Sequence, residues 1–534
     1  MHVSSTTNLD KGCPPSSVNH FRRAPYLLLP LLAAITLPVQ SSQELLNAKC
    51  TACHVATDDG GLFRIKDQRK APESWDMTLV RMQVAHGVPL TGDERRSLVK
   101  YLADTQGLAP SESAAERGTL ERQPAHIDNP PDDMMAAMCS RCHTWSRVGL
   151  QRRTEDEWLK HVHFHVGQYP TIEYQALARD RDWFKDAVEQ VVPALGKMLP
   201  LESEAWDSWK AAEHKAPTGE WTVVGHRIGG NDFGGTLSVT ADGDNYKLSI
   251  NTIDSDGNAA ESTGSAIVYT GYEWRARAGK GDSASLQVMA MSEDGNQMSG
   301  RWYDENNEAL GSNVVAIRSD AAASVIGIVP ASIKVDNETP ITVYGSGLTN
   351  ALSVEGLTLS NVEVAANGSS LSATATATAS GVIAVGNGGQ IVAYDKIDSV
   401  KVEPAAAIAR VGGNGGPIAE VPAQFDAIAY SNGPDGEAGT DDDVRIGALP
   451  ATWSVAPFDE IAEHDGDVKY AGVMDAKTGL FAPAGAGLNP ERKFSTNNVG
   501  NLKVIASVDQ DGEAVTGEGH LIVTVQRFVD PPVR

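Results

Sequence analysis

The pattern of hydrophobic and polar positions divides the chain into a helical first part and a longer strand-rich part. Helical runs end near residue 215, and short stretches that alternate between apolar and polar residues begin at Gly219. Examples are residues 236–240 and 246–250, which are separated by Gly, Asp and Asn. Alternation of this kind is typical of antiparallel strands joined by turns. The sequence therefore predicts a multidomain fold, with an N-terminal α-helical domain followed by all-β domains.

The strand-rich part is too long for one core and is expected to form several domains. About eight strands between residues 218 and 320 predict a small up-and-down, lipocalin-like antiparallel β-barrel. Gly219-Glu-Trp221 stands at its start and Gly300-Arg-Trp302 near its end. A filled, structural barrel is favoured over one that encloses a ligand. Residues 322–403 and 405–534 have short strands rich in Val, Ala, Ser and Thr, which predict two immunoglobulin-like sandwiches without a disulfide.

The charge of the chain restricts its partners. A formal net charge of −25 argues against binding to nucleic acid, which would require a basic surface. Some of the acidic residues lie together in the loop 435–443. Clustered oxygen ligands are what calcium requires, but the loop lacks the twelve-residue EF-hand pattern. A solvated acidic loop is therefore favoured over a calcium site.

The first forty residues have the features of a targeting segment. Arg22 and Arg23 supply positive charge, and residues 27–39 form a short apolar run that contains two prolines. We expect residues 1–41 to be a secretory signal peptide, with an uncut anchor as the alternative. No other run approaches the ~18 apolar residues of a membrane span. The sequence therefore predicts a mature periplasmic chain with no membrane span.

The cysteines carry the strongest chemical signal. Cys13 lies in the segment that we expect to be removed, and the other four form two C-x-x-C-H motifs at residues 50–54 and 139–143. This pattern is typical of c-type haem attachment, because two thiols bind one porphyrin edge and the next histidine ligates the iron. A redox disulfide or an all-thiolate zinc site is the alternative. We expect two covalently bound haem c groups, with thioethers to Cys50, Cys53, Cys139 and Cys142, and with His54 and His143 on the irons.

An internal repeat indicates the sixth ligand of each iron. After the first motif, Met82 follows Trp75 by seven residues, and after the second motif, His165 follows Trp158 by seven residues. Further along, residues 89–94 match residues 200–204, and each match is expected to open a helix with acidic residues in its first turn. The helical domain 43–215 is therefore predicted to hold two tandem haem units, 43–108 and 125–215. The second unit carries an insertion at about 166–197.

The repeat assigns Met82 to the first iron and His165 to the second. Methionine on a helix is more often a core residue than a ligand, and His86 is the rival of Met82. Met198, which lies beside a proline, is the rival at the second iron, and His161 and His163 are close to His165. A His/Met iron has a higher reduction potential than a bis-His iron, so the two haems are expected to be poised differently.

The order of these features resembles a known family. Two tandem haem motifs, a G-x-W barrel and two immunoglobulin-like regions resemble the large (alpha) subunit of quinohaemoprotein amine dehydrogenase, over nearly the whole mature chain. The resemblance implies a heterotrimer with a small quinone-bearing catalytic subunit and a β-propeller subunit. It implies oxidation of primary amines, with electrons passed through the haems to a cupredoxin or a soluble cytochrome c. The positions that match the family's haem motifs are Cys50, Cys53, His54, Cys139, Cys142 and His143.

The chain itself has no recognisable catalytic constellation. It contains no nucleophile elbow, Walker loop or H-E-x-x-H motif, and we assign it no catalytic residue. Its role is expected to be redox transfer within an oxidoreductase. The alternatives are a free-standing dihaem carrier, the cytochrome subunit of another dehydrogenase, a dihaem peroxidase, and a cell-surface interaction protein.

Overall fold

The computed structural model describes residues 41–124, 126–173, 179–281, 284–413, 419–433 and 435–525. The described residues from Ser42 onward belong to one compact unit. The predicted signal peptide, including Cys13, lies outside the described residues except for its last position, and so does part of the predicted insertion at 166–197. Within the described ranges, no helix combines the length and the apolar character that crossing a membrane requires.

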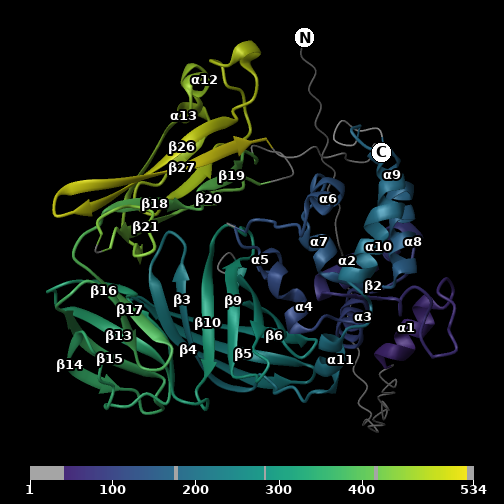
Figure 1. Ribbon diagram of the computed structural model, residues 1–534, viewed down its shortest axis with the longest axis horizontal. Helices are drawn as coiled ribbons and strands as arrows, with labels where there is room; N and C mark the ends of the chain where they lie inside the picture. Colours follow the sequence, from purple (N-terminus) through teal and green to yellow (C-terminus); the bar gives the residue numbers. More distant parts are fainter. Residues whose placement is uncertain are drawn as a thin grey trace, which may run out of the picture. The chain divides into compact units, whose positions relative to one another are not determined.

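The first part of the chain is helical, as predicted (Figure 1). Thr91 and Glu94 form a reciprocal capping box that starts α3, and Thr154 caps α8 by accepting a hydrogen bond from the amide of Glu157. Gly87 ends α2 in a left-handed conformation that glycine adopts at little cost. The main helices are α1 (Ser42–Cys50), α2 (Pro72–His86), α3 (Gly92–Thr105), α7 (Ser146–Gly149), α8 (Glu155–Gln168), α10 (Val192–Met198) and α11 (Glu204–Ala211).

Two short strands join the halves of this helical region. Strand β1 (Gln68–Lys70) pairs antiparallel with β2 (Gln151–Arg153). Arg69 of β1 forms a buried ion pair with Glu112, at 2.7 Å, and Arg152 of β2 approaches the same carboxylate, at 3.3 Å. One carboxylate from α4 (Pro110–Ser113) therefore holds both strands.

The predicted eight-stranded up-and-down barrel is confirmed. Strands β3 to β10 close into a barrel in which each strand pairs with its neighbours in sequence and β10 returns to β3. Its interior is filled by large side chains that include Trp221, Leu237, Trp274 and Met289. A cavity of about 1170 Å³ lies at one end, lined by Phe233 and Trp302 among others. The strands are β3 (Gly219–Arg227), β4 (Asp232–Asp242), β5 (Asn245–Asp254), β6 (Ala259–Tyr269), β7 (Glu273–Ala278), β8 (Ser285–Met291), β9 (Gln297–Asp304) and β10 (Gly311–Arg318).

The barrel packs against the helical region through buried polar contacts. Arg117 donates to the carboxylate of Glu273 in β7, at 2.6 Å, and Arg275 binds the same carboxylate from the other side. The hydroxyl groups of Ser113 and Tyr272 form a 2.8 Å hydrogen bond nearby. Because each charged group in this contact has an opposite partner, the burial of these charges is compensated.

The C-terminal part consists of further sheets. Strands β11 (Ser324–Val329), β13 (Thr339–Ser346), β15 (Ser370–Ala377) and β14 (Leu357–Val364) form one sheet, and β12 (Ser332–Lys334), β17 (Gly389–Tyr394) and β16 (Gly381–Val385) form another. Beyond them, the longest sheet contains β19 (Ala406–Arg410), β27 (Glu513–Thr524), β26 (Gly500–Gln510) and β23 (Thr452–Pro457). Two apolar cores, around Val343 and around Leu502, accompany these sheets. The immunoglobulin-like assignment of residues 322–403 and 405–534 stays a prediction.

Two smaller sheets complete this C-terminal part, and one of them contacts the barrel. The small sheets are β18 (Ser399–Glu403), β21 (Asp426–Ser431) and β22 (Val444–Ala448), and β20 (Ala423–Gln424), β25 (Leu480–Pro483) and β24 (Gly472–Met474). His226 of the barrel lies between Asp232, at 2.8 Å, and Asp426 of β21, at 3.1 Å. Burial alone would lower the pKa of His226, but these two carboxylates outweigh it and raise the pKa to about 10. The protonated imidazole therefore links the barrel to the C-terminal sheets.

Candidate haem sites

The first C-x-x-C-H motif begins where α1 ends. The amides of Cys53 and His54 both donate to the carbonyl of Cys50, so the three side chains leave one tight turn. His54 Nδ1 lies 3.0 Å from the carbonyl oxygen of Phe63. A hydrogen bond at Nδ1 fixes the ring and leaves Nε2 as the nitrogen for a metal.

Met82 lies on the inner face of α2. It follows the buried Trp75 and Leu79 at helical spacing, so that the three side chains share one side of the helix. Met82 itself is half-buried, whereas His86 is exposed at the last turn. Met82 and His86 lie on the same face of α2 and differ in exposure, because His86 stands at the exposed end of the helix. Met77, on another face, lines the cavity of the second unit.

The second motif opens on a cavity of about 620 Å³. Cys139 lies in a wide helical turn, η2 (Ala136–Ser140), and the amide of His143 donates to the Cys139 carbonyl. Cys139, Cys142, His143 and His165 all line this cavity. The His143 Nδ1 lies 2.9 Å from the carbonyl oxygen of Thr144, which again leaves Nε2 available. The volume is within the usual range for cofactor sites.

Helix α8 places its three neighbouring histidines in different surroundings. His165 shares a face with the buried Trp158 and Val162, and its Nδ1 lies 2.8 Å from the carbonyl oxygen of His161. Burial lowers the pKa of His165, and that of His161 even more, which favours the neutral imidazole that ligates metals. His161 also lines the cavity, where its ring lies 4.7 Å from that of His165. His163 is exposed and contacts Phe184.

Met198, the rival ligand, lies outside the cavity lining. It is the last residue of α10, and its side chain is 40% exposed. Residues of the same helix, such as Leu195, do line the cavity. His143 and His165 therefore line the same cavity, together with His161, and Met198 does not.

The surroundings of the thiols argue against the two alternatives to haem attachment. Burial, with smaller contributions from Asp132 and Cys142, raises the pKa of Cys139 to about 12, and burial also raises the pKa of Cys50. A redox-active cysteine pair would instead have a lowered pKa. Within the described part of the chain, the one group of His, Cys, Asp and Glu ligand atoms that converges within 4.8 Å contains no cysteine. The four thiols therefore do not form a single zinc site.

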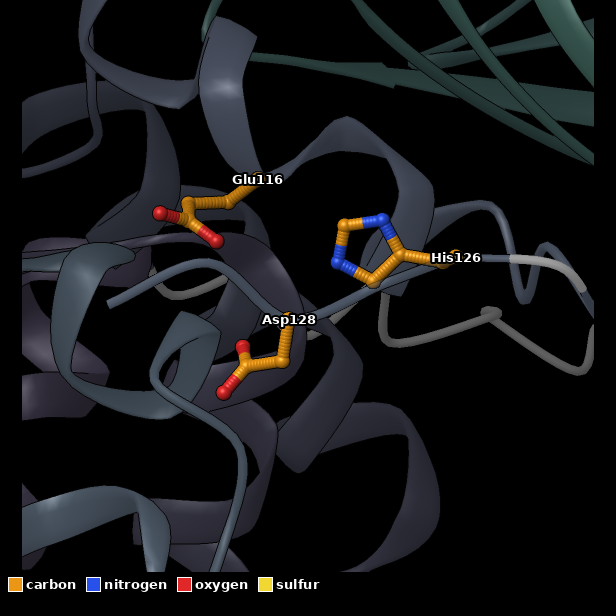
Figure 2. A group of neighbouring side chains, drawn as sticks. All are labelled: Glu116, His126 and Asp128. Atoms are coloured by element: carbon orange, nitrogen blue, oxygen red, sulfur yellow. The ribbon is translucent and has the colours of Figure 1, made fainter. Parts of the chain in front are cut away.

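That converging group is formed by Glu116, His126 and Asp128, whose side chains point toward one another (Figure 2). The Asp128 carboxylate accepts the amides of Trp145, at 2.5 Å, and Ser146, at 3.2 Å. The Ser146 hydroxyl donates to Glu116 at 2.5 Å. These contacts cap the start of α7, directly after the second haem motif. Asp128, near the start of the second unit, and Glu116, between the units, thus contact the residues that follow this motif.

Several carboxylate oxygens of the acidic loop 435–443 accept hydrogen bonds within the loop. Asp442 accepts the amide of Asp435 and the hydroxyl of Thr440, and Asp443 accepts the amide of Gly439. Oxygens used in this way serve as turn acceptors, and the choice between a solvated loop and a calcium site stays a prediction.

Sequence reasoning missed a second repeated element. Strand β1 has the sequence Gln-Arg-Lys and strand β2 the sequence Gln-Arg-Arg. The glutamine of each triplet stands seven residues before the tryptophan of its unit, Trp75 or Trp158. In the fold, Lys70 lies 4.8 Å above the ring of Trp75, and Arg153 lies 5.2 Å above the ring of Trp158. The repeat that aligns Trp75 with Trp158 extends to these triplets on its N-terminal side, so the sequence alone could have revealed them. Both basic side chains line the cavity of the second unit.

Comparison with known proteins gives matches to three family models. Residues 40–206 match "Quinohemoprotein amine dehydrogenase A, alpha subunit, haem binding", residues 214–319 match domain II of that subunit, and residues 400–533 match its domain IV. No curated protein matches the chain.

Solved structures give only distant likenesses. A de novo designed fluorescence-activating β-barrel is 17% identical over 19% of this chain and 92% of its own, with a TM-score of 0.17. Drosophila N-cadherin EC1-3 is 10% identical over 45% of this chain and 86% of its own, with a TM-score of 0.20. Scores this low carry no argument about function. The three family models, by contrast, span the helical region, the barrel and the last sheets, and on these matches the chain belongs to the family of the haem-binding alpha subunit of quinohaemoprotein amine dehydrogenase, an oxidoreductase.

Proposed function

We propose that this chain is the dihaem c electron-transfer subunit of a periplasmic quinohaemoprotein amine dehydrogenase. When bound, each haem c supplies a one-electron couple between ferric and ferrous iron. The first haem is held by Cys50, Cys53, His54 and Met82, and the second by Cys139, Cys142, His143 and His165.

One observation carries this proposal: His143 and His165 line a single cavity with both thiols of the second motif. Each imidazole has its Nδ1 beside a backbone carbonyl oxygen, so both rings are oriented before any metal is present. Such orientation by a second hydrogen bond is what metal-ligating histidines require. The first unit repeats the framework, with the Nδ1 of His54 beside a carbonyl and Met82 at the position equivalent to His165.

The organic chemistry takes place on other subunits. Oxidation of a primary amine to an aldehyde and ammonia, with addition of water, releases two electrons and two protons. Two one-electron carriers on one chain match this number. With the four cysteines outside the signal segment bound to haem, the chain has none left to form a quinone cofactor. The proposed partners are a small quinone-bearing subunit and a β-propeller subunit, with a cupredoxin or cytochrome c as acceptor.

The β regions act as scaffold in this proposal. The barrel and the two C-terminal regions, proposed to be immunoglobulin-like, support the helical region and provide surface for the other subunits. The large side chains packed inside the barrel support a structural role, and the cavity lies only at one end of the barrel.

The test compares the isolated chain with the native complex. The complex is expected to reduce its haems when a primary amine is added, whereas the isolated chain should not. Phenylhydrazine, which traps quinone carbonyls, should block reduction by amine but not by dithionite, because it leaves the iron unchanged. Haem reduction by amine in the purified chain alone would contradict this division of roles.

The same preparations separate the alternatives. Purification as a monomer without any quinone-bearing chain would favour a free-standing carrier. Reduction by a donor other than an amine would favour the cytochrome subunit of another dehydrogenase. Turnover of peroxide would favour a dihaem peroxidase, which needs an open or displaceable iron ligand.

A further inference from the structure

The cavity of the second unit carries charge of one sign. Four basic side chains line it, and no Asp or Glu does so among the described residues. The chain as a whole has a formal net charge of −25, so this wall is opposite in sign to the protein around it. The four basic residues are Lys70, Arg81, Arg147 and Arg153.

Half of this basic wall comes from the other haem unit. Lys70 belongs to β1 and Arg81 to α2, which are both parts of the first unit. Their position in the second cavity follows from the β1–β2 pairing, which places Lys70 opposite Gln151. The first unit therefore completes the wall of a cavity whose cysteines and histidines come from the second.

The positive charges of this wall are poorly compensated. Lys70 is only 2% exposed; its ammonium group donates to the Thr78 hydroxyl at 3.0 Å and has no carboxylate partner among the described residues. Arg81 stacks on Phe164, and its buried Nε has no hydrogen-bond partner within the described ranges.

Arg153 has one acidic partner, Glu157, which also binds Arg64. The carboxylate of Glu157 binds both Arg153 and Arg64, at 3.4 and 2.8 Å. The buried Nε of Arg153 has no hydrogen-bond partner among the described residues. Buried cations are costly unless an anion pairs with them. The cavity is therefore built for a ligand that brings negative charge.

We propose that Lys70, Arg81 and Arg153 bind the two propionate carboxylates of the haem in the second unit. This inference rests on the proposed dihaem function. Two carboxylates supply the negative charge that the wall lacks, and planar guanidinium groups pair well with carboxylates. The first unit is thus part of the second unit's cofactor site, and neither unit forms a complete site alone.

The basic wall has a consequence for electron transfer. Ferrous haem carries one positive charge less than ferric haem, so cations nearby stabilise the reduced state and raise the reduction potential. A bis-His iron has a lower potential than a His/Met iron. The wall counteracts this difference and brings the second haem closer in potential to the first.

The experiment is a spectroelectrochemical titration of the full-length holoprotein. Arg81→Met and Lys70→Met are compared with Lys197→Met, which removes the same charge from an exposed position outside the cavity lining. For each cavity variant, we expect the reduction equilibrium constant of one haem to fall by about tenfold, the size expected for one charge near a half-buried centre, which is ~59 mV for one electron. The other haem should shift less, and Lys197→Met should shift neither.

Further variants and conditions keep the result decisive. Arg81→Lys retains the charge and should restore most of the potential. Unchanged potentials in both Arg81→Met and Lys70→Met would overturn the proposal, and if Lys70→Met fails to fold, Arg81→Met decides alone. If the effect varies with added phosphate, a free anion occupies the wall and the propionate assignment is wrong. The mass of the denatured wild-type chain is measured first. If covalent haem is absent, the proposed dihaem function is wrong, and this outcome is distinct from a failure of the basic residues to bind propionates.

Discussion

The two haem units have the same local design and different surroundings. In each unit, a Gln-Arg-basic triplet precedes a buried tryptophan, a basic side chain lies over the indole ring, and a candidate ligand follows on the same helix face. The cavity of the second unit is partly walled by Lys70 and Arg81 of the first. The sequence repeat therefore determines the positions of the candidate ligands, while packing between the two units gives the two sites different surroundings.

The candidate ligand is the second difference between the units. The position equivalent to His165 is Met82, so the same helix geometry presents a thioether in one unit and an imidazole in the other. If ligand type alone set the potentials, the two haems would be well separated. The basic wall that we propose beside the predicted bis-His iron acts in the opposite direction. Each prediction below alters one part of this comparison.

The largest expected effect comes from removing one pair of thiols. The double variant Cys139→Ala/Cys142→Ala should lose one of two covalent haems, because no thioether can form in the second unit. The double variant Cys50→Ala/Cys53→Ala should lose the other. Mass of the denatured chain counts the attached haems. Retention of two covalent haems in either variant would mean that the mutated motif does not attach a haem.

Exchanging the ligand should make the units alike. Met82→His is expected to abolish the weak near-infrared sulfur-to-iron band of the oxidised protein and to lower the potential of the first haem. Optical spectra and a redox titration measure both changes. Met198→Leu serves as control, since Met198 is outside the cavity lining. Survival of the band in Met82→His, with its loss in Met198→Leu, would reverse the assignment.

The carboxylate that holds β1 and β2 can be removed without touching either site. Glu112→Gln leaves the guanidinium groups of Arg69 and Arg152 buried without a counter-charge, which should cost about 3–5 kcal/mol in the free energy of unfolding. Asp76→Asn breaks the exposed pair with Arg95 and should cost at most about 1 kcal/mol. Denaturant titrations of the two variants give the comparison. Similar values would mean that the β1–β2 junction is not a major contact between the units.

The same carboxylate predicts a dependence on pH. Burial would raise the pKa of Glu112, but hydrogen bonds and charge from Arg69, with help from Arg152, lower it to about 2. Its pKa in the folded state is thus below the ordinary value of 4.5, so its stabilisation is complete above about pH 4.5 and is lost as the pH falls through 2. The difference in stability between wild type and Glu112→Gln should therefore shrink below pH 4. A constant difference down to pH 2 would contradict the assignment.

The smallest effect is expected at the cap of α7. Asp128→Ala removes the acceptor of the Trp145 and Ser146 amides, and the loss of such a cap costs about 1 kcal/mol. Because this cap follows the second motif only, the first haem should be unaffected. Hydrogen exchange of the two amides, with the spectrum of each haem, measures the change. Equal disturbance of both haems would show that the Asp128 contacts affect both units and not the second alone.

Much of the site could be read from the sequence because its geometry is local. A C-x-x-C-H motif places two thiols and an imidazole in one turn, and a ligand seven residues after a tryptophan must share its helix face. The order of helical region and barrel followed from a change of hydrophobic period at Gly219. The family could also be inferred from this order, and the comparisons confirm it.

What the tertiary structure decided is contact between segments that are far apart in sequence. Lys70 and Arg153 are separated by more than eighty residues, and only the β1–β2 register brings them to one cavity. The tertiary structure also places His165 in the lining of the cavity and Met198 outside it, although both are plausible ligands by type. Local spacing fixes the direction of a side chain on its own helix, but charge compensation depends on every chain segment that packs around a buried group, and no single stretch of sequence contains that information.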